Sequence, residues 1–140
     1  MTSLSFSKAK QVNKTPKKAV KKVKKSTLRN KADKLMSLHI RSLGFCQIKG
    51  LDTVRCSEQL NDMHIRTRGV IAMRYALDNH LCGCSGHHVF YTNNPAKWEA
   101  LVKKNFPAQW KYIEKHQNDK VKRTEDLYRE VIARYSKEGV

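Results

Sequence analysis

Acidic residues are scarce in this sequence, and none occurs before Asp33. The chain has 12 Asp and Glu against 29 Lys and Arg, so its formal net charge is +17 at pH 7. Nine lysines lie between Lys8 and Lys25, and the residues beyond them still carry about +8. Basic charge on both tail and body predicts a polyanionic partner. The alternative is a solvated basic face with a purely charge-driven role.

Long apolar runs are also absent. No stretch approaches the ~20 residues that cross a bilayer, and no apolar core follows Met1. The lysines of "KKAVKKVKKS" are interleaved with small residues, without the bulky apolar face of a membrane-surface helix. We therefore expect no membrane partner and a cytoplasmic location.

Only four cysteines are present, and no secretory signal accompanies them. In a reducing compartment, closely spaced Cys and His residues bind metal more often than they form disulfides. Two of the cysteines and three histidines gather in "DNHLCGCSGHHVFYT", which covers residues 78–92. Within it, Cys84 and His87 have the C-x2-H spacing of half a zinc knuckle.

The other half of a closed zinc site must come from upstream, where Cys46 precedes a Gly-containing turn. The simplest tetrahedral site for a structural Zn²⁺ consists of Cys46, Cys56, Cys84 and His87. Cys82 is a rival ligand, because Cys82-x-Cys84 is too tight for both thiolates to bind one ion comfortably. Without a metal, these residues would be small buried thiols beside an unligated histidine.

Helical periodicity is clear at both ends of the chain. Residues 1–25 are rich in lysine and poor in apolar residues, which predicts a basic arm that is disordered until it binds. Residues 26–44 have one apolar face and end at Gly44, a typical helix stop. Residues 107–140 again predict helices.

Residues 45–106 have a different texture. Up to residue 93, short apolar pieces alternate with turn residues, which predicts a two-stranded element with long irregular connections. Asn94-Pro95 then caps a new helix. A hydrophobic core this small usually needs an additional stabilising cross-link, and a bound metal provides one. The sequence therefore predicts an α+β fold, with a small zinc-stapled core between flanking helices.

Three residues of this core have the order and spacing of a nuclease motif. His64, Asn79 and His88 form H-x14-N-x8-H, which resembles the HNH (ββα-metal) nucleases. In sequence order, "KADKLMSLHIRSLGFC", "MHIRTRG", "MRYALDN" and "CSGHHVFYTNNP" resemble the phage HNH proteins of the Rap/NinG recombination-nuclease kind, over roughly residues 26–113. The resemblance implies a ββα-metal core and a metal-dependent endonuclease of phage type, active on duplex or branched DNA in the host cytoplasm.

The chemistry of phosphodiester hydrolysis asks for these residue types. His64 would be the general base, since histidine can deprotonate water near neutral pH. His88 would ligate a catalytic Mg²⁺ or Mn²⁺, and the resemblance gives Asn79 the task of fixing the loop that aims His64. The adjacent His87 and His88 would then serve two different metals. His80 has no role in this pattern and is expected at the surface.

The chain departs from the family pattern at two positions. Many relatives have an acid or a histidine where this chain has Met63, and a thioether is a poor ligand for Mg²⁺. Asp62 is the nearest carboxylate and the second expected ligand of the catalytic ion, although strand alternation places it on the face of His64. Some relatives have a further histidine at the position of Thr92. Two alternatives therefore stay open: a non-catalytic zinc-stabilised DNA-binding module, and a basic structural protein that binds nucleic acid, including RNA.

Basic residues within the motif and in the arm before it are expected to contact DNA. Arg66 and Arg68 would share the face of His64 on an extended segment and clamp the flanking phosphates. The arm would add affinity by releasing counterions, so binding should depend steeply on salt. The expected arm contacts are Lys17, Lys18, Lys21, Lys22, Lys24 and Lys25. A homodimer would suit double-strand cutting, and the C-terminal helix could form its interface.

Overall fold

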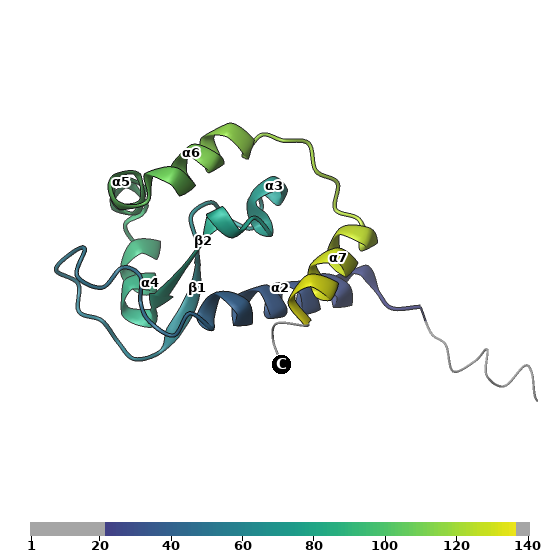
Figure 1. The fold of residues 1–140 in the computed structure, drawn as a ribbon, viewed down its shortest axis with the longest axis horizontal. Coiled ribbons are helices and arrows are strands. Elements are labelled where there is room, and N and C mark those ends of the chain that lie inside the picture. Colours follow the sequence, from purple (N-terminus) through teal and green to yellow (C-terminus); the bar gives the residue numbers. More distant parts are fainter. Residues whose placement is uncertain (1–21, 137–140) are drawn as a thin grey trace, which may run out of the picture.

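The computed structural model describes residues 22–136, in which six α-helices surround a two-stranded antiparallel sheet (Figure 1). The elements are α2 (Lys25–Arg41), β1 (Leu60–His64), α3 (Ile71–Arg74), the 3₁₀ turn η1 (Leu77–Asn79), β2 (His80–Cys84), α4 (Ser85–Thr92), α5 (Pro95–Asn105), α6 (Pro107–His116) and α7 (Glu125–Ser136). This is an α+β fold with long connections around a short hairpin, as predicted. Most of the expected disordered arm lies outside the described residues.

Helix α2 forms where the apolar period predicts it, and the chain reverses after it. The helix ends at Arg41, and Gly44 beyond it has φ +84°, a conformation that side chains disfavour. Helix α7 lies against α2 (Figure 1) and covers its apolar face. The core that the two helices share consists of Leu28, Ala32, Met36, Tyr128, Val131 and Tyr135. The apolar stripe of α7 is therefore covered by α2 of the same chain.

A buried ion pair ties α2 to α3. The Nε and Nη2 atoms of Arg74 donate to the two carboxylate oxygens of Asp33 at 2.9 and 2.5 Å, and the Tyr75 hydroxyl donates at 2.8 Å. The side chains of Asp33 and Arg74 are only 13% and 12% exposed. Burial alone raises the pKa of Asp33, but the hydrogen bonds from Arg74 and Tyr75 outweigh it and lower that pKa below its usual value.

Replacing Asp33 with asparagine is expected to lower the free energy of unfolding by about 3 kcal/mol, because Arg74 keeps its charge without a partner. Since the folded pKa is depressed, the carboxylate stabilises the fold above its unfolded pKa, and the contribution is lost as pH falls through the folded value. Urea unfolding at neutral pH, where the contribution is fully present, measures the change. The control is Asp119→Asn at an exposed pair, and equal stabilities of the two variants would contradict the prediction.

β1 and β2 pair antiparallel along their whole length. Met63 lies opposite Leu81, and His64 lies opposite His80. Gly83 makes room for Met63, because a Cβ atom at Gly83 would lie 2.1 Å from the Met63 sulfur. The main core under the sheet and helices α4 to α6 consists of Cys46, Ile48, Met63, Ile65, Met73, Leu81, Cys84, Tyr91, Trp98, Leu101, Val102, Trp110 and Ile113.

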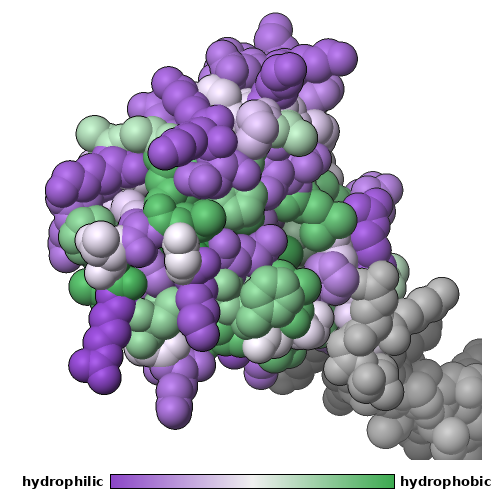
Figure 2. All heavy atoms as spheres, turned by 60° about the vertical axis from the view of Figure 1, so that its left-hand side comes forward, coloured by the Kyte–Doolittle hydropathy of each residue, from purple (hydrophilic) through white to green (hydrophobic). Residues whose placement is uncertain are grey.

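The surface agrees with a chain of low mean hydropathy. Hydrophilic side chains cover most of the face shown in Figure 2, with smaller hydrophobic areas between them. Within residues 22–136, no helix combines the length and apolarity that crossing a membrane requires.

Candidate functional site

Four side chains from separate parts of the chain meet beside β2. The sulfurs of Cys46, Cys56 and Cys84 lie 3.5, 3.6 and 3.0 Å from Nδ1 of His87. All four ligand atoms lie within 4.8 Å of one another, so the group could hold a metal ion such as zinc. These are the four residues named from the sequence as zinc ligands. Cys82, the rival ligand, is not part of the group.

The C-x2-H spacing follows from the way α4 begins. Cys84 is the N-cap of the helix, and its sulfur accepts a hydrogen bond from the backbone N–H of His87 at 3.4 Å. The spacing is therefore that of an N-cap and the third helical residue, which bring the thiol and the imidazole together. His88 follows at a rotation of about 100° around the helix. Adjacent histidines thus face different surroundings.

A carboxylate outside the group orients its histidine. Oδ1 of Asp52 lies 2.8 Å from Nε2 of His87, and the Tyr91 hydroxyl donates to the other oxygen of Asp52. Histidines that ligate metals usually donate their second N–H to a carboxylate in this way. Neither Asp52 nor Tyr91 was identified from the sequence. Asp52 is a single acid in an irregular loop, and no spacing pattern distinguishes it.

The pKa values of two thiols in the group, Cys84 and Cys56, are shifted in opposite directions. Burial raises the pKa of Cys84, but hydrogen bonds from the backbone of His87 and Ser57 outweigh it and bring that pKa down to about 6. Burial and the neighbouring Cys46 and Cys84 raise the pKa of Cys56 to about 12. Clustered thiolates repel one another, and a bound cation removes that repulsion. A metal ion bound here would therefore displace protons from these thiols.

We expect Asp52→Asn to weaken zinc binding by about 10- to 100-fold, because His87 loses the carboxylate that holds its ring. Competition for Zn²⁺ with a chromogenic chelator measures the affinity. Glu58→Gln, an exposed acid in the same loop, is the matched control and should bind zinc like the wild type. Equal affinities of all three proteins would mean that Asp52 has no part in the site.

A second group of side chains surrounds a pocket of about 340 Å³ between the end of β1, α4 and the start of α5. His64 is the last residue of β1 and His88 is the fourth of α4, and both line this pocket. The other lining residues are Met63, Ile65, Thr67, Arg68, Tyr91, Thr92, Pro95 and Trp98. Two histidines that are distant in sequence therefore share one cavity.

Asn79 braces the chain that follows His64. Its side chain is fully buried, accepts a hydrogen bond from the Arg66 N–H at 2.7 Å and donates one to the Arg66 carbonyl at 3.0 Å. The Asn79 carbonyl also accepts from the N–H of Ile65 at 2.9 Å. These bonds fix the first residues after β1, which is the role that the family resemblance implies for Asn79.

Asp62 does not join His88. Nδ1 of His88 lies 3.2 Å from the side-chain amide nitrogen of Asn61, the strand residue before Asp62. Asp62 instead contacts His64 at 3.9 Å and His80 at 2.7 Å. Among the described residues, Asp62 contacts these two histidines and His88 contacts Asn61, so an ion shared by Asp62 and His88 stays a prediction. The expectation that His80 lies at the surface is wrong, because this residue is 4% exposed.

His64 is held in its neutral form. Burial lowers its pKa to about 4, with a smaller contribution in the same direction from His80, while Asp62 opposes the shift. Its side chain keeps 17% exposure, on the pocket that also contains His88. A neutral imidazole that reaches solvent is able to accept a proton.

The two arginines do not share an extended face, because the chain bends after β1 ends at His64. Arg66 turns inward, where its Nε donates to Gln117 at 3.1 Å and its guanidinium lies 4.8 Å from the Trp110 ring centroid. Arg68 has a side chain that is 54% exposed, and it lines the pocket with the two histidines. Arg66 therefore does not line the pocket with Arg68, whose guanidinium also lies 3.8 Å from the Asp33 carboxylate. A joint phosphate clamp of the two arginines stays a prediction.

The arm is described only where it meets α2. Lys22 and Lys24 precede the helix, Lys25 begins it, and all three are exposed. Lys17, Lys18 and Lys21, which are expected to bind DNA, lie outside the described residues.

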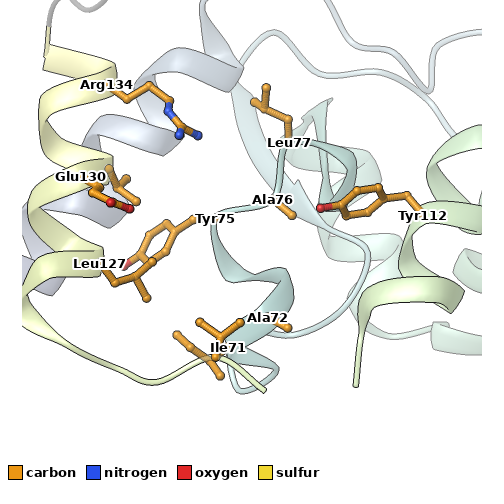
Figure 3. A pocket seen from close by; sticks show the side chains of 11 residues that line it. Ile71, Ala72, Tyr75, Ala76, Leu77, Tyr112, Leu127, Glu130 and Arg134 are labelled. Atoms are coloured by element: carbon orange, nitrogen blue, oxygen red, sulfur yellow. The ribbon is translucent and has the colours of Figure 1, made fainter. Parts of the chain in front are cut away.

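Another pocket, of about 330 Å³, lies between α3, α6 and α7 (Figure 3). Its walls are largely apolar, and among the described residues that line it there is no histidine or cysteine. It therefore lacks the chemistry of the pocket around His64 and His88.

No protein-family description, curated protein or solved structure matches this chain.

Proposed function

We propose that this chain is a metal-dependent endonuclease of the HNH type, which hydrolyses phosphodiester bonds in DNA. The observation that carries the proposal is the shared pocket of His64 and His88, between the end of β1 and α4, the helix that follows β2. Asn79 supports it, because its side chain fixes the backbone beyond His64. β1 and α4 thus present one base and one metal ligand to the same space.

In this proposal His64 removes a proton from the attacking water, since its imidazole is neutral and borders the pocket. His88 would hold a divalent ion such as Mg²⁺ or Mn²⁺, which when bound supplies a positive charge for the phosphate and the leaving oxygen. The side-chain amide of Asn61, 3.2 Å from Nδ1, restrains the ring of His88. One protein ligand fits Mg²⁺, which usually keeps several waters and binds substrate phosphate.

The cysteine group has a separate task. A structural Zn²⁺ at Cys46, Cys56, Cys84 and His87 would fasten the loop before β1 to the start of α4. This helix carries His87 on the zinc side and His88 on the pocket side. The zinc would therefore set the position of the metal-binding histidine without taking part in cleavage.

Positive charge would bring the DNA to this pocket. Arg68 stands beside the two histidines with a half-exposed guanidinium, a suitable contact for a phosphate next to the cut. The exposed Lys22, Lys24 and Lys25, together with the arm before them, would bind the backbone without reading bases. Branched DNA as substrate and a homodimer stay predictions.

The test is digestion of linear, flapped and four-way DNA by the full-length, zinc-loaded protein with Mg²⁺, Mn²⁺ or no added divalent ion. Cleavage that requires an added ion is the expected result. Tight DNA binding without cleavage in any ion would instead favour the non-catalytic DNA-binding module. A pocket with a single protein ligand for the ion also suits that alternative. A preference for RNA would favour the structural nucleic-acid-binding protein.

A further inference from the structure

Asp62 and His80 form a buried pair directly beside His64. Oδ1 of Asp62 lies 2.7 Å from Nδ1 of His80, and their side chains are 6% and 1% exposed. The rings of His64 and His80 meet edge to face, with their centroids 4.6 Å apart. The motif that identifies His64 includes neither partner. A polar group without a partner would be costly at this depth, and each of the two side chains provides that partner for the other.

His80 acts as a brace for Asp62. Its second nitrogen, Nε2, donates to the backbone carbonyl of Arg74 at 2.8 Å, so both ring nitrogens already face an oxygen. Arg74 is fixed in turn by its two bonds to Asp33. The Asp62 carboxylate is thus held by a chain of contacts that reaches back to α2.

The free oxygen of this carboxylate faces one particular atom of His64. Oδ2 of Asp62 lies 3.9 Å from Nε2 of His64, which is too long for a hydrogen bond but close for a charge interaction. A neutral imidazole has one protonated and one bare nitrogen, and only the bare nitrogen can take a proton from water. A negative charge beside Nε2 favours the proton there.

We propose that Asp62, held by His80, is a positioning residue that selects the Nε2-protonated tautomer of His64 and leaves Nδ1 as the proton acceptor. The catalytic meaning of this tautomer rests on the proposed function. The tautomer itself is a property of the folded chain, and it can be measured whether or not the protein cuts DNA.

The first test is ¹⁵N NMR of the histidine rings in the full-length, zinc-loaded protein, because the two ring nitrogens differ in shift when one is protonated. We expect His64 to carry its proton on Nε2 in the wild type. Asp62→Asn, which keeps the shape of the side chain, should shift the tautomer ratio about tenfold toward Nδ1. Asp119→Asn, at the exposed pair with His116, is the control and should leave His64 unchanged. A wild-type proton on Nδ1, or no shift in Asp62→Asn, would overturn the proposal.

The second test uses cleavage kinetics. Asp62→Asn should lower kcat up to about 100-fold with little change in KM, since the residue acts on the base and not on DNA binding. Added to His64→Ala, it should cause no further loss, because its effect passes through His64. A further loss in the double variant would assign Asp62 a merely structural role and reject the proposal.

The same three side chains could alternatively hold a metal, since their ligand atoms lie within 4.8 Å of one another. Elemental analysis distinguishes the two cases. One zinc per chain in both the wild type and His80→Gln agrees with a positioning pair. A second bound metal that disappears in His80→Gln would overturn the proposal.

Discussion

Cys84→Ala is expected to abolish zinc binding and to unfold the hairpin together with α4, whereas Cys82→Ala should keep both the metal and the fold. Both cysteines are fully buried on β2, so the two substitutions remove the same atoms from similar depth. Only Cys84 belongs to the group of four ligand residues. A difference between the two variants therefore measures the metal site, together with the α4 cap that Cys84 also provides, and not the loss of packing.

The magnitude of this effect follows from how such sites fold. Binding of a structural Zn²⁺ is worth about 10–16 kcal/mol in zinc-finger peptides at neutral pH. Small domains have total stabilities of about 5–15 kcal/mol, so losing the ion can remove the whole margin. Cys84 also caps α4, and a missing cap adds about 1 kcal/mol.

Elemental analysis and circular dichroism of both variants and the wild type measure the result. We expect one zinc per chain and a cooperative thermal transition in the wild type and in Cys82→Ala. Cys84→Ala should contain no zinc and melt without cooperativity. A zinc-loaded Cys84→Ala protein would show that the cysteine group does not hold the ion.

Local patterns in the sequence were enough to predict most of the fold. The helical period predicted α2 and α7, and the prolines after Asn94 and Phe106 fixed the starts of α5 and α6. Such signals depend on neighbours within a few residues. The four possible zinc ligands were also predicted, because the N-cap spacing of Cys84 and His87 left few partners for them in a chain with four cysteines.

Contacts that depend on tertiary packing were not predictable. His80 was expected at the surface, but pairing with β1 places it beside Asp62 and under the Arg74 carbonyl. Arg66 was expected on the face of His64, but the strand ends there and its guanidinium turns to Trp110. In both cases the deciding partner is distant in sequence, and no spacing rule connects the two.

His64→Ala is expected to reduce DNA cleavage by about 10³-fold while DNA binding, zinc content and folding stay intact. A general base contributes about 10²- to 10⁴-fold, and alanine leaves no group to accept the proton. The side chain stands at the end of β1 and borders the pocket, so its removal enlarges an existing pocket. The four cysteine-group residues are not changed by this substitution, which is why zinc should remain.

His116→Ala is the matched control, because this histidine also faces an aspartate but lies at the exposed end of α6. Rates are compared under single-turnover conditions with saturating protein, so that differences in DNA affinity do not enter. His88→Ala should also lose cleavage, and higher concentrations of Mn²⁺ should recover part of it, whereas no ion should rescue His64→Ala. That contrast separates a base from a metal ligand. Wild-type cleavage by His64→Ala would show that the pocket shared by the two histidines is not where DNA is cut.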